Sequence, residues 1–444
     1  MTLKEVKKIV EERGIEFFLC SFVAMEGAPK AKLVPATHLD GMAEKGAGFA
    51  GFAAGNMGQG PADPDMMNIP DFNSLTPVPW RPNMAWVPGN IYVEGQPFDY
   101  CPRTILQRQL DRAIAKGFRF KVGVEAEFML LRKAEDGDYV PSDDLDILEK
   151  PCYDLVTLNR NLDVMTTLIR YMQELGWEPY ANDHEDANCQ FEINWGYADA
   201  ITTADRQTFF RWMVKTVAEQ SGLMATFMPK PFDHLTGSGA HYHMSLWDPD
   251  GKTNLFQDDG DPSGLSEMAY HFMGGILNHA RALVAINAPL VNSYKRLVRG
   301  APRSGASWAP VYVTYGGSNR TQMIRIPDGG RIENRSVDGA ANPYLACAAM
   351  LAAGLDGVDN KTDPGTRNVD NLYEVPEQEL RARGINFLPS SLREACDCLE
   401  RDDVVREALG TDYADYYVEC KRTEWSTYHN TVTPWERKTY LPIY

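Results

Sequence analysis

A short apolar run over residues 121–130, with two acidic side chains set into it, constrains the fold of this chain more than any other feature. The pattern predicts a β-strand, in which successive side chains point to opposite faces. Glu125 and Glu127 would share one face, while the apolar residues around them pack on the other. Two carboxylates a few ångströms apart repel by roughly 3 kcal/mol at an effective dielectric constant of 20, so either a cation lies between them or one holds a proton. The alternative is an exposed edge strand with a solvated acidic face.

Length and composition bound the class of protein. A chain of 444 residues predicts two or three folding units, and 44% hydrophobic with 24% charged residues is typical of a globular protein. The net charge of −17 argues against nucleic acid or an anionic membrane as the main partner. With no N-terminal signal pattern and no apolar run of about 18 residues, we expect a cytoplasmic protein without membrane spans. The 8 cysteines are interpreted as reduced structural thiols.

The first hundred residues are predicted to form a small unit built around a sheet. Its expected elements are a helix over 2–13, strands over 17–23 and 30–35, a long irregular segment over 41–71, and strands over 84–87 and 91–94. A helix beginning near Pro102 then marks the start of a second unit.

The rest of the chain is predicted to alternate longer helices with strands, which indicates an α/β or α+β catalytic body. Apolar residues at helical spacing predict helices across 158–172, 204–221 and 267–286. Two further helices are expected over 391–400 and 402–420, followed by an aromatic run over 424–444.

Three later segments carry residues that could bind a metal ion or take part in catalysis. Carboxylates at 185 and 192 lie in a loop that leads into a strand; His241, His243 and Ser245 would share one strand face; and Arg331, Glu333 and Arg335 would share another. A single histidine on a strand is more often a satisfied buried residue. Taken together, however, five glutamates with an imidazole suit magnesium or manganese better than zinc, which prefers cysteine and several histidines.

The order of these segments resembles the glutamine synthetase family. The stretch Gly-Ser-Gly-Ala-His-Tyr-His-Met-Ser at 237–245 is one of its motifs, and the other matching stretches are residues 65–66, 69–71, 123–128, 184–192, 294–298, 319–320, 325–327, 331–333 and 371–373. The resemblance covers nearly the whole chain. It implies an α+β fold with a small N-terminal β-grasp-like domain, residues 1–100, and a large catalytic domain, residues 101–444, whose curved antiparallel sheet is flanked by helices.

The resemblance also implies roles for individual residues. One divalent ion, Mg²⁺ or Mn²⁺, would be held by Glu127, Glu185 and Glu192, and a second by Glu125, His241 and Glu333. Each active site would thus hold two or more ions. Substrate glutamate would contact Gly237 and His241, with Arg296 and Arg335 binding its carboxylates. Arg320 and Arg325 would receive the transferred phosphoryl group, and Arg325, Arg331, His243 and Ser245 would lie near the nucleotide phosphates. For each arginine the alternative is a surface ion pair.

The implied reaction is an ATP-dependent ligation. The γ-carboxylate of L-glutamate takes the γ-phosphoryl group of ATP, because a free carboxylate does not react with an amine at neutral pH. The amine then attacks the acyl phosphate and phosphate leaves. Two metal ions and several arginines would neutralise the charge that phosphoryl transfer develops.

The sequence departs from the family where the amine should bind. The family carries Phe-Asp-Gly-Ser-Ser where residues 51–56 read Gly-Phe-Ala-Ala-Gly-Asn, and Trp308 stands where a flap glutamate is expected. An indole in place of carboxylates favours an alkylammonium, through contact with its methyl group and cation–π attraction of about 0.5–2 kcal/mol. We therefore interpret the chain as most similar to the glutamate–methylamine ligase (γ-glutamylmethylamide synthetase) branch of the family.

Several alternatives remain open from the sequence. An ordinary glutamine synthetase using ammonia, and a catalytically silent regulator that binds nucleotide or glutamate, are the rival functions. Asp65, Asp186 and Tyr242 are candidates for the group that takes the proton of the amine. Tyr373 lies in a motif that is adenylylated in some bacterial members, or is an ordinary loop tyrosine. By resemblance we expect a homo-oligomer, a dodecamer of two stacked hexameric rings in which the N-terminal sheet of one subunit completes the active site of the next.

Overall fold

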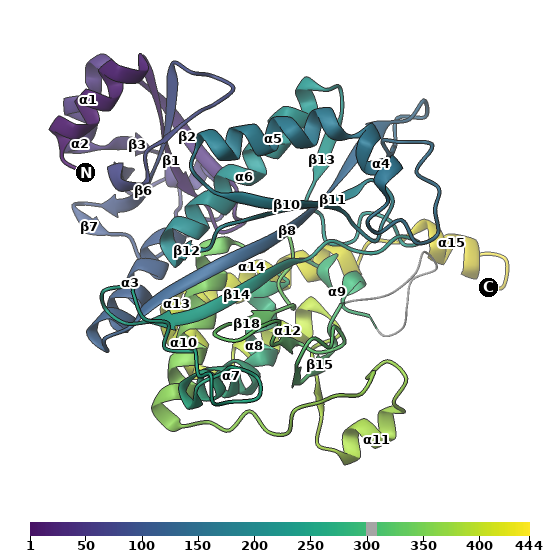
Figure 1. The fold of residues 1–444 in the computed structure, drawn as a ribbon. Helices are drawn as coiled ribbons and strands as arrows, with labels where there is room; N and C mark the ends of the chain where they lie inside the picture. Colours follow the sequence, from purple (N-terminus) through teal and green to yellow (C-terminus); the bar gives the residue numbers. More distant parts are fainter. Residues whose placement is uncertain (299–308) are drawn as a thin grey trace.

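The computed structural model describes residues 1–298 and 309–444. Two β-sheets, of seven and ten strands, form the frame, and helices cover them (Figure 1). Most strand pairs are antiparallel, and the helices are not interleaved as regular crossovers. The architecture is the α+β class that the sequence predicts.

The N-terminal sheet occupies one corner of the molecule (Figure 1). Its strands run in the order β2-β1-β6-β4-β3, with β5 and β7 paired to β6. The elements are α1 (Leu3–Arg13), β1 (Phe17–Val23), β2 (Pro29–Pro35), η1 (Ala36–His38), α2 (Leu39–Lys45), β3 (Ala47–Phe49), η2 (Gly51–Ala53), β4 (Met66–Pro70), η3 (Phe72–Ser74), β5 (Thr76–Pro77), β6 (Met84–Val93) and β7 (Gln96–Pro97). Helix α1 begins at a capping box between Thr2 and Glu5 and ends at Gly14, which lies in the left-handed region.

Two predictions for this sheet were wrong. The strands expected over 84–87 and 91–94 are one continuous strand, β6, which runs through Pro88 and Gly89 because those residues still pair with β1 and β4. The segment 41–71, expected to be irregular, contains α2, β3 and β4, because tertiary pairing with β6 overrides its Gly-rich composition.

The second sheet is organised around β8 (Arg119–Lys133), which lies between β11 (Gln190–Trp195) and β14 (Ala240–Trp247). The strand order is β10-β11-β8-β14-β18-β17-β16, and β9, β12 and β13 also pair with β8. The remaining strands are β9 (Tyr139–Pro141), β10 (Pro179–His184), β12 (Ala198–Asp199), β13 (Met224–Thr226), β16 (Tyr315–Gly316), β17 (Ile324–Arg325) and β18 (Ile332–Asn334). The strand that carries Glu125 and Glu127 is therefore central, and the alternative of an exposed edge strand was wrong.

Several helices pack against the hydrophobic core behind this sheet, where Val122, Val124, Ala126 and Phe128 of β8 are buried, while α11 (Glu377–Ala382) and α15 (Pro434–Tyr440) lie at the periphery (Figure 1). The other helices are α3 (Pro102–Ala115), α4 (Leu155–Arg160), α5 (Leu162–Glu174), α6 (Ala200–Gln220), α7 (Glu267–Asn278), α8 (Ala280–Asn287), α9 (Ser293–Arg296), α10 (Pro343–Asn360), α12 (Leu392–Leu399), α13 (Asp403–Leu409) and α14 (Thr411–His429), with a small pair of strands, β15 (Tyr312–Val313) and β19 (Asn386–Phe387). Among the described helices, none combines the length and apolar character that crossing a bilayer requires.

Three predicted helices are interrupted. The segment 158–172 divides at Asn161, the segment 267–286 at His279, and the segment 402–420 at Gly410. Gly410 has φ 90° and ψ 126°, which no helix accommodates and which L side chains rarely adopt. Apolar spacing alone therefore located these helices correctly but did not show where each one breaks.

A buried arginine joins the two sheets. Arg103, in the first turn of α3, is 2% exposed and pairs with Asp71 at 2.8 Å and with Asp205 of α6 at 3.1 Å. Its Nη1 also donates to the side chain of Asn90 in β6 at 3.2 Å, and the hydroxyl of Tyr344 donates to Asp205 at 2.6 Å. The N-terminal sheet is thereby fixed to the helices behind the second sheet. A domain boundary at residue 100 stays a prediction.

Candidate active site

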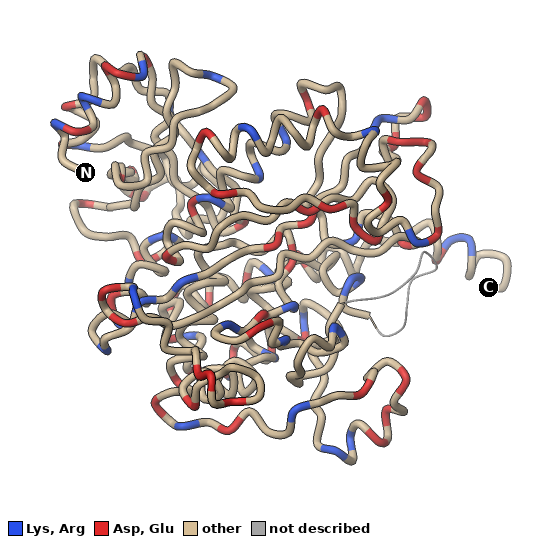
Figure 2. The backbone as a smooth tube through the Cα atoms, in the orientation of Figure 1, with Lys and Arg blue, Asp and Glu red and all other residues tan. Residues whose placement is uncertain are grey.

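Strand register brings the acidic residues into rows across the second sheet. Glu192 of β11 lies opposite both Glu127 of β8 and Asp183 of β10, and His241 of β14 lies opposite Glu125. Side chains opposite one another on neighbouring strands share a face of the sheet. In Figure 2 the acidic positions of these strands fall close together where the strands cross the middle of the view.

A further row lies toward the other edge of the sheet. Glu333 of β18 is opposite His243 of β14 and also opposite Arg325 of β17. His243 Nε2 lies 2.9 Å from Glu125 Oε1, so this row joins the first at Glu125. Residues that are far apart in the sequence are thus gathered by antiparallel pairing alone.

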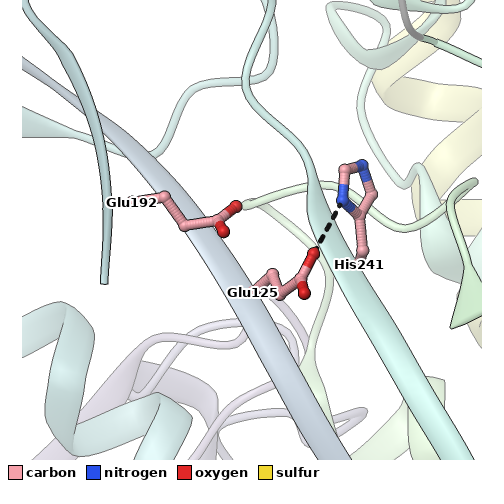
Figure 3. A group of neighbouring side chains, drawn as sticks. All are labelled: Glu125, Glu192 and His241. Atoms are coloured by element: carbon pink, nitrogen blue, oxygen red, sulfur yellow. Dashed lines mark ion pairs between the residues drawn. The ribbon is translucent and has the colours of Figure 1, made fainter. Parts of the chain in front are cut away.

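Three groups of side chains could each hold a cation. In each, one ligand atom per residue lies within 4.8 Å of the others: Glu125, Glu192 and His241; Glu125, His243 and Glu333; Asp183, Glu185 and Glu192. Figure 3 shows the first group, with His241 directed at Glu125 and Glu192 reaching toward them from the neighbouring strand. Carboxylate oxygens with one imidazole suit Mg²⁺ or Mn²⁺.

The predicted division of ligands between two ions is similar but not identical to these groups. Asp183 and His243 enter, whereas Glu127 accepts hydrogen bonds from Gln190 Nε2 at 3.0 Å and from the backbone N–H of Gly239 at 2.8 Å. Glu127 remains 3.9 Å from His241 Nε2. The assignment of Glu127, Glu185 and Glu192 to one ion, and of Glu125, His241 and Glu333 to the other, stays a prediction.

The carboxylates of the cluster are neutralised in two different ways. Burial tends to raise the pKa of Glu125 and Glu333, but hydrogen bonds and charges from His241, His243 and Arg335 outweigh it and hold both pKa values well below the usual range. Burial and neighbouring carboxylates raise the pKa of Glu185 to about 8 and that of Glu192 well above its usual value. Within residues 1–298 and 309–444, burial and neighbouring carboxylates are the largest influences on the pKa values of Glu185 and Glu192, and a divalent ion at β10 and β11 would relieve this repulsion.

Two buried arginines lie beside the cluster. Arg296, at the end of α9, donates from Nη2 to the carbonyl oxygen of Arg335 at 3.1 Å, and burial lowers the pKa of its guanidinium. Within residues 1–298 and 309–444, its buried Nη1 has no hydrogen-bond partner. Arg335 Nη1 lies 2.6 Å from Glu333 Oε1. Arg296 therefore keeps a donor for an anionic group, whereas Arg335 is engaged with a carboxylate of the cluster.

Gly237 passes close to Arg296. A Cβ at this position would lie 2.5 Å from the carbonyl oxygen of Pro229 and 3.1 Å from Cγ of Arg296, so a larger residue would displace the arginine. The structure therefore brings together Gly237 and Arg296, two of the residues predicted to contact glutamate.

A cavity of about 520 Å³ adjoins the cluster at Glu125. The predicted nucleotide residues His243, Ser245 and Arg331 line it, but Arg325 does not and instead pairs with Glu333 at 2.8 Å. The sequence interpretation missed other lining residues, among them Lys121, Tyr197, Trp247 and Asn254. Lys121 Nζ lies 3.8 Å from the centroid of the Trp247 ring, so the wall of the cavity combines an aromatic face with a cation.

Comparison with known proteins agrees with this geometry. Residues 99–440 match the family described as glutamine synthetase, catalytic domain. The chain belongs to the glutamine synthetase family. It is 45% identical to a glutamine synthetase of Rhizobium meliloti (strain 1021) and 45% identical to a glutamate–methylamine ligase of Methyloversatilis universalis, each over 100% of both chains. A solved structure described as a GmaS/ADP complex shares 50% sequence identity at a TM-score of 0.92, covering 98% of this chain and 99% of that one.

Membership of the glutamine synthetase family makes the chain a glutamate–amine ligase. Enzymes of this family use ATP and divalent metal ions, and the carboxylate groups described above have the donor chemistry to hold such ions. The expectation drawn from motif order is thereby confirmed at the level of family and reaction class.

Neither part of the predicted amine site is tested by the structure, and both stay predictions. Trp308 lies outside the described residues. Ala53 and Ala54 lie in or next to η2, and Asn56 donates to Glu26 of the N-terminal sheet. Within the described chain, residues 51–56 neither line the cavity nor join the three carboxylate groups.

The structure also places the three candidates for the proton acceptor, of which Asp65 is exposed immediately before β4. Tyr242 was a wrong candidate: it alternates with His241 and His243, so it points into the hydrophobic core, where burial raises its pKa well above its usual value. Asp186 lies next to the cluster: its backbone N–H donates to Glu185 and its carboxylate accepts from Thr236 at 2.8 Å.

Asp183 and Tyr153 are the residues near the cluster that the sequence interpretation passed over. Asp183 had a usable signal, because it stands two residues before Glu185 in an extended segment. Tyr153 had none. Its backbone N–H donates to the carbonyl oxygen of His184 at 2.9 Å, which brings its backbone next to Glu185, while the residue itself is 65% exposed.

Proposed function

We propose that this ligase joins the γ-carboxylate of L-glutamate to methylamine, giving γ-glutamylmethylamide, ADP and phosphate. Trp308, in place of the glutamate that closes the ammonium pocket in the family, is the observation that carries the proposal. The absence of an acidic residue over 51–56 supports it in the same direction. So do the identities of 45% with a named glutamate–methylamine ligase and 50% with a GmaS structure.

The described residues suit the steps of this reaction. Arg296, with Arg335 behind it, would bind glutamate, and Gly237 and His241 would lie against it. The cavity lined by His243, Ser245 and Arg331 would take the nucleotide, while Arg320 and Arg325 would stabilise charge on the transferred phosphoryl group. Two Mg²⁺ or Mn²⁺ ions, held by Glu125, Glu127, Glu185, Glu192, His241 and Glu333, would supply Lewis-acid neutralisation of the phosphate oxygens.

The proposed chemistry has two bond exchanges. An oxygen of the γ-carboxylate attacks the γ-phosphorus of ATP and ADP leaves, which forms γ-glutamyl phosphate. The nitrogen of methylamine then attacks the carbonyl carbon, phosphate leaves, and the nitrogen loses a proton. Of the candidate acceptors, Asp186 is the one that lies beside the cluster.

We infer the quaternary structure of this chain from its resemblance to the family. We propose a dodecamer of two stacked hexameric rings, with residues 1–100 as an N-terminal domain and 101–444 as the catalytic domain. An exposed edge strand, β2, supports this, because it leaves backbone groups available to a neighbour. We also place the reaction in the cytoplasm, since it consumes ATP and glutamate.

Glutamate-dependent release of phosphate from ATP tests the function directly. Ammonia, methylamine, ethylamine and putrescine are supplied separately at equal concentration. We expect strong turnover with methylamine and little with ammonia. Ammonia as the best amine would establish an ordinary glutamine synthetase, for which the 45% identity with the Rhizobium meliloti enzyme is the supporting observation. No release of phosphate with any of the four amines would favour a catalytically silent regulator.

Substitution of Trp308 tests the residue. Trp308→Glu should shift the ratio of turnover with methylamine to turnover with ammonia toward ammonia, because a carboxylate restores a partner for ammonium and removes the aromatic face. Trp308→Phe keeps an aromatic ring and serves as the matched control. A ratio that stays the same in Trp308→Glu would exclude Trp308 from the amine site.

A further inference from the structure

A buried aspartate lies behind the hairpin that carries two of the proposed metal ligands. Asp146, in the loop between β9 and α4, is 5% exposed. Its carboxylate accepts three hydrogen bonds, all from the turn between β10 and β11: from His184 Nε2 at 2.7 Å, from the backbone N–H of Cys189 at 2.6 Å and from Asn188 Nδ2 at 2.9 Å. Neither the described reaction nor the carboxylate groups of the cluster use this residue.

His184 connects Asp146 to Glu185. Its side chain is fully buried, and while Nε2 faces Asp146, Nδ1 lies 2.8 Å from the carbonyl oxygen of Glu185. The imidazole also meets the ring of Phe191 edge-on, with centroids 5.2 Å apart. The ring therefore has one position, and it fixes the backbone of Glu185 from the side opposite to the carboxylate cluster.

The turn needs such support for two reasons. Cys189 has φ 59°, a left-handed conformation that a non-glycine residue keeps only where its surroundings hold it. The carboxylates of Asp183, Glu185 and Glu192 lie together at the end of the hairpin, so in the ionised form that binds a cation their mutual repulsion acts to spread it. Asp146 holds the turn at both of its ends, through His184 and through Cys189.

We propose that Asp146 and His184 are positioning residues, which hold the β10–β11 turn so that Glu185 and Glu192 are preorganised for a divalent cation. This inference rests on the proposed function, since it assumes that the cluster binds metal. Partners of this kind, one step removed from the ion, typically alter metal affinity about 10- to 100-fold when they are substituted. The effect falls on metal binding and on the concentration of metal required, rather than on turnover at saturating metal.

Binding of Mn²⁺ to the intact enzyme, measured by isothermal titration without nucleotide or amine, tests the proposal. Asp146→Asn keeps the shape of the side chain and removes the charge that draws the three donors. We expect it to weaken Mn²⁺ binding by about 10-fold or more and to raise the Mn²⁺ concentration for half-maximal activity by a similar factor, with kcat at saturating Mn²⁺ retained.

Asp402→Asn is the matched control. It removes the carboxylate from another buried histidine–aspartate contact, in which His279 Nδ1 lies 2.7 Å from Asp402 Oδ2, away from the cluster. Mn²⁺ affinity should stay within about twofold of the unsubstituted enzyme, in line with the small effects of substitutions remote from a site. Equal weakening by both variants would show general destabilisation and overturn the proposal.

A milder variant covers the case in which Asp146→Asn does not fold. Asn188→Ala removes one of the three hydrogen bonds from a half-buried side chain and should weaken Mn²⁺ binding a few-fold. Unchanged Mn²⁺ affinity in Asp146→Asn, or in Asn188→Ala where the former is unfolded, would refute the positioning role. An unsubstituted enzyme that binds no Mn²⁺ would instead refute the metal site of the proposed function.

Discussion

At the scale of single residues, each acid of the central strand meets its own kind of partner. Glu125 lies between two imidazoles, with His243 Nε2 at 2.9 Å and His241 Nδ1 at 3.5 Å. Glu127 is held by an amide side chain and a backbone N–H. Two residues apart in the sequence, they differ in chemistry because the strands beside them differ. The sequence of the central strand shows that the charges of its two glutamates must be balanced. Residues on the neighbouring strands determine which group balances each one.

Arg296→Lys should raise the KM for glutamate about 10- to 100-fold, which corresponds to about 1.4–2.7 kcal/mol. Lysine offers a point charge in place of two parallel donors, and it loses the bond from Nη2 to the carbonyl oxygen of Arg335. Initial rates against glutamate concentration measure the effect. Arg281→Lys, at an exposed pair with Glu394, is the control and should leave the KM unchanged. A KM for glutamate equal in both variants would remove Arg296 from the substrate site.

At the scale of elements, one junction between helices contains a histidine that pairs with two aspartates. His279 separates α7 from α8, and its ring lies 2.7 Å from Asp402, at the start of α13, and 3.1 Å from Asp356 of α10. Burial tends to lower the pKa of His279, but the hydrogen bonds and charges of the two aspartates outweigh it and raise the pKa above its usual value. One imidazole thus links four helices.

The stability that His279 contributes should depend on pH. Because its pKa is raised in the folded state, the contribution is complete below the unfolded value of about 6.5 and is lost as pH rises through the folded value. His279→Gln should therefore lower the free energy of unfolding by roughly 1–3 kcal/mol near pH 6 and by less near pH 9. Urea denaturation of both proteins at the two pH values measures this. A difference that grows with pH would contradict the assignment.

Gly410→Ala should destabilise the protein by roughly 1–3 kcal/mol, because the backbone between α13 and α14 has a conformation that a side chain disfavours. Gly60→Ala is the matched control: Gly60 has no positive φ, and a Cβ there would meet only Asp63 at 3.7 Å, so we expect a change within about 0.5 kcal/mol. Thermal denaturation of the two variants decides the comparison. Equal stability would mean that the junction adapts.

Prediction from sequence succeeded where the signal is local. Alternation along the chain located the strand of Glu125 and the strand of His241, and apolar spacing located the helices. It failed where pairing decides: β6 continues through Pro88 because strands on either side hold it. Asp183 joins the cluster because β10 pairs in register with β11. Asp146 had no signal in the sequence, since its role depends on partners 38 and 43 residues further along the chain.

At the scale of the whole molecule, Arg103 is one of the contacts that join the two sheets, beside hydrogen bonds from Asn342 and a shared hydrophobic core. The guanidinium of Arg103 pairs with Asp71, just after β4, and with Asp205 in α6; Arg103 and Asp205 are buried, and Asp71 is partly buried. A buried charge that loses its partner costs several kcal/mol. The N-terminal sheet is therefore attached by chemistry that tolerates little change.

Arg103→Met should lower the free energy of unfolding by about 3–5 kcal/mol, because Asp205 and Asp71 would be left without their cation. Arg108→Met, on the same helix as Arg103, breaks a pair with the exposed Asp99 and should cost no more than about 1 kcal/mol. Denaturation by urea compares the two. A cost for Arg103→Met as small as for the control would show that the sheet is held by apolar packing instead.

The attachment through Arg103 also bears on assembly. A small sheet on a flexible hinge would meet a neighbour over a range of angles and settle on contact. Here the direction in which the exposed strand β2 faces is set inside a single chain, by the Arg103 contact together with the apolar packing between the N-terminal sheet and the main core. If the proposed ring is built through that strand, its curvature would follow from the angle at which each folded subunit presents β2, and the number of subunits in the ring would depend on that angle.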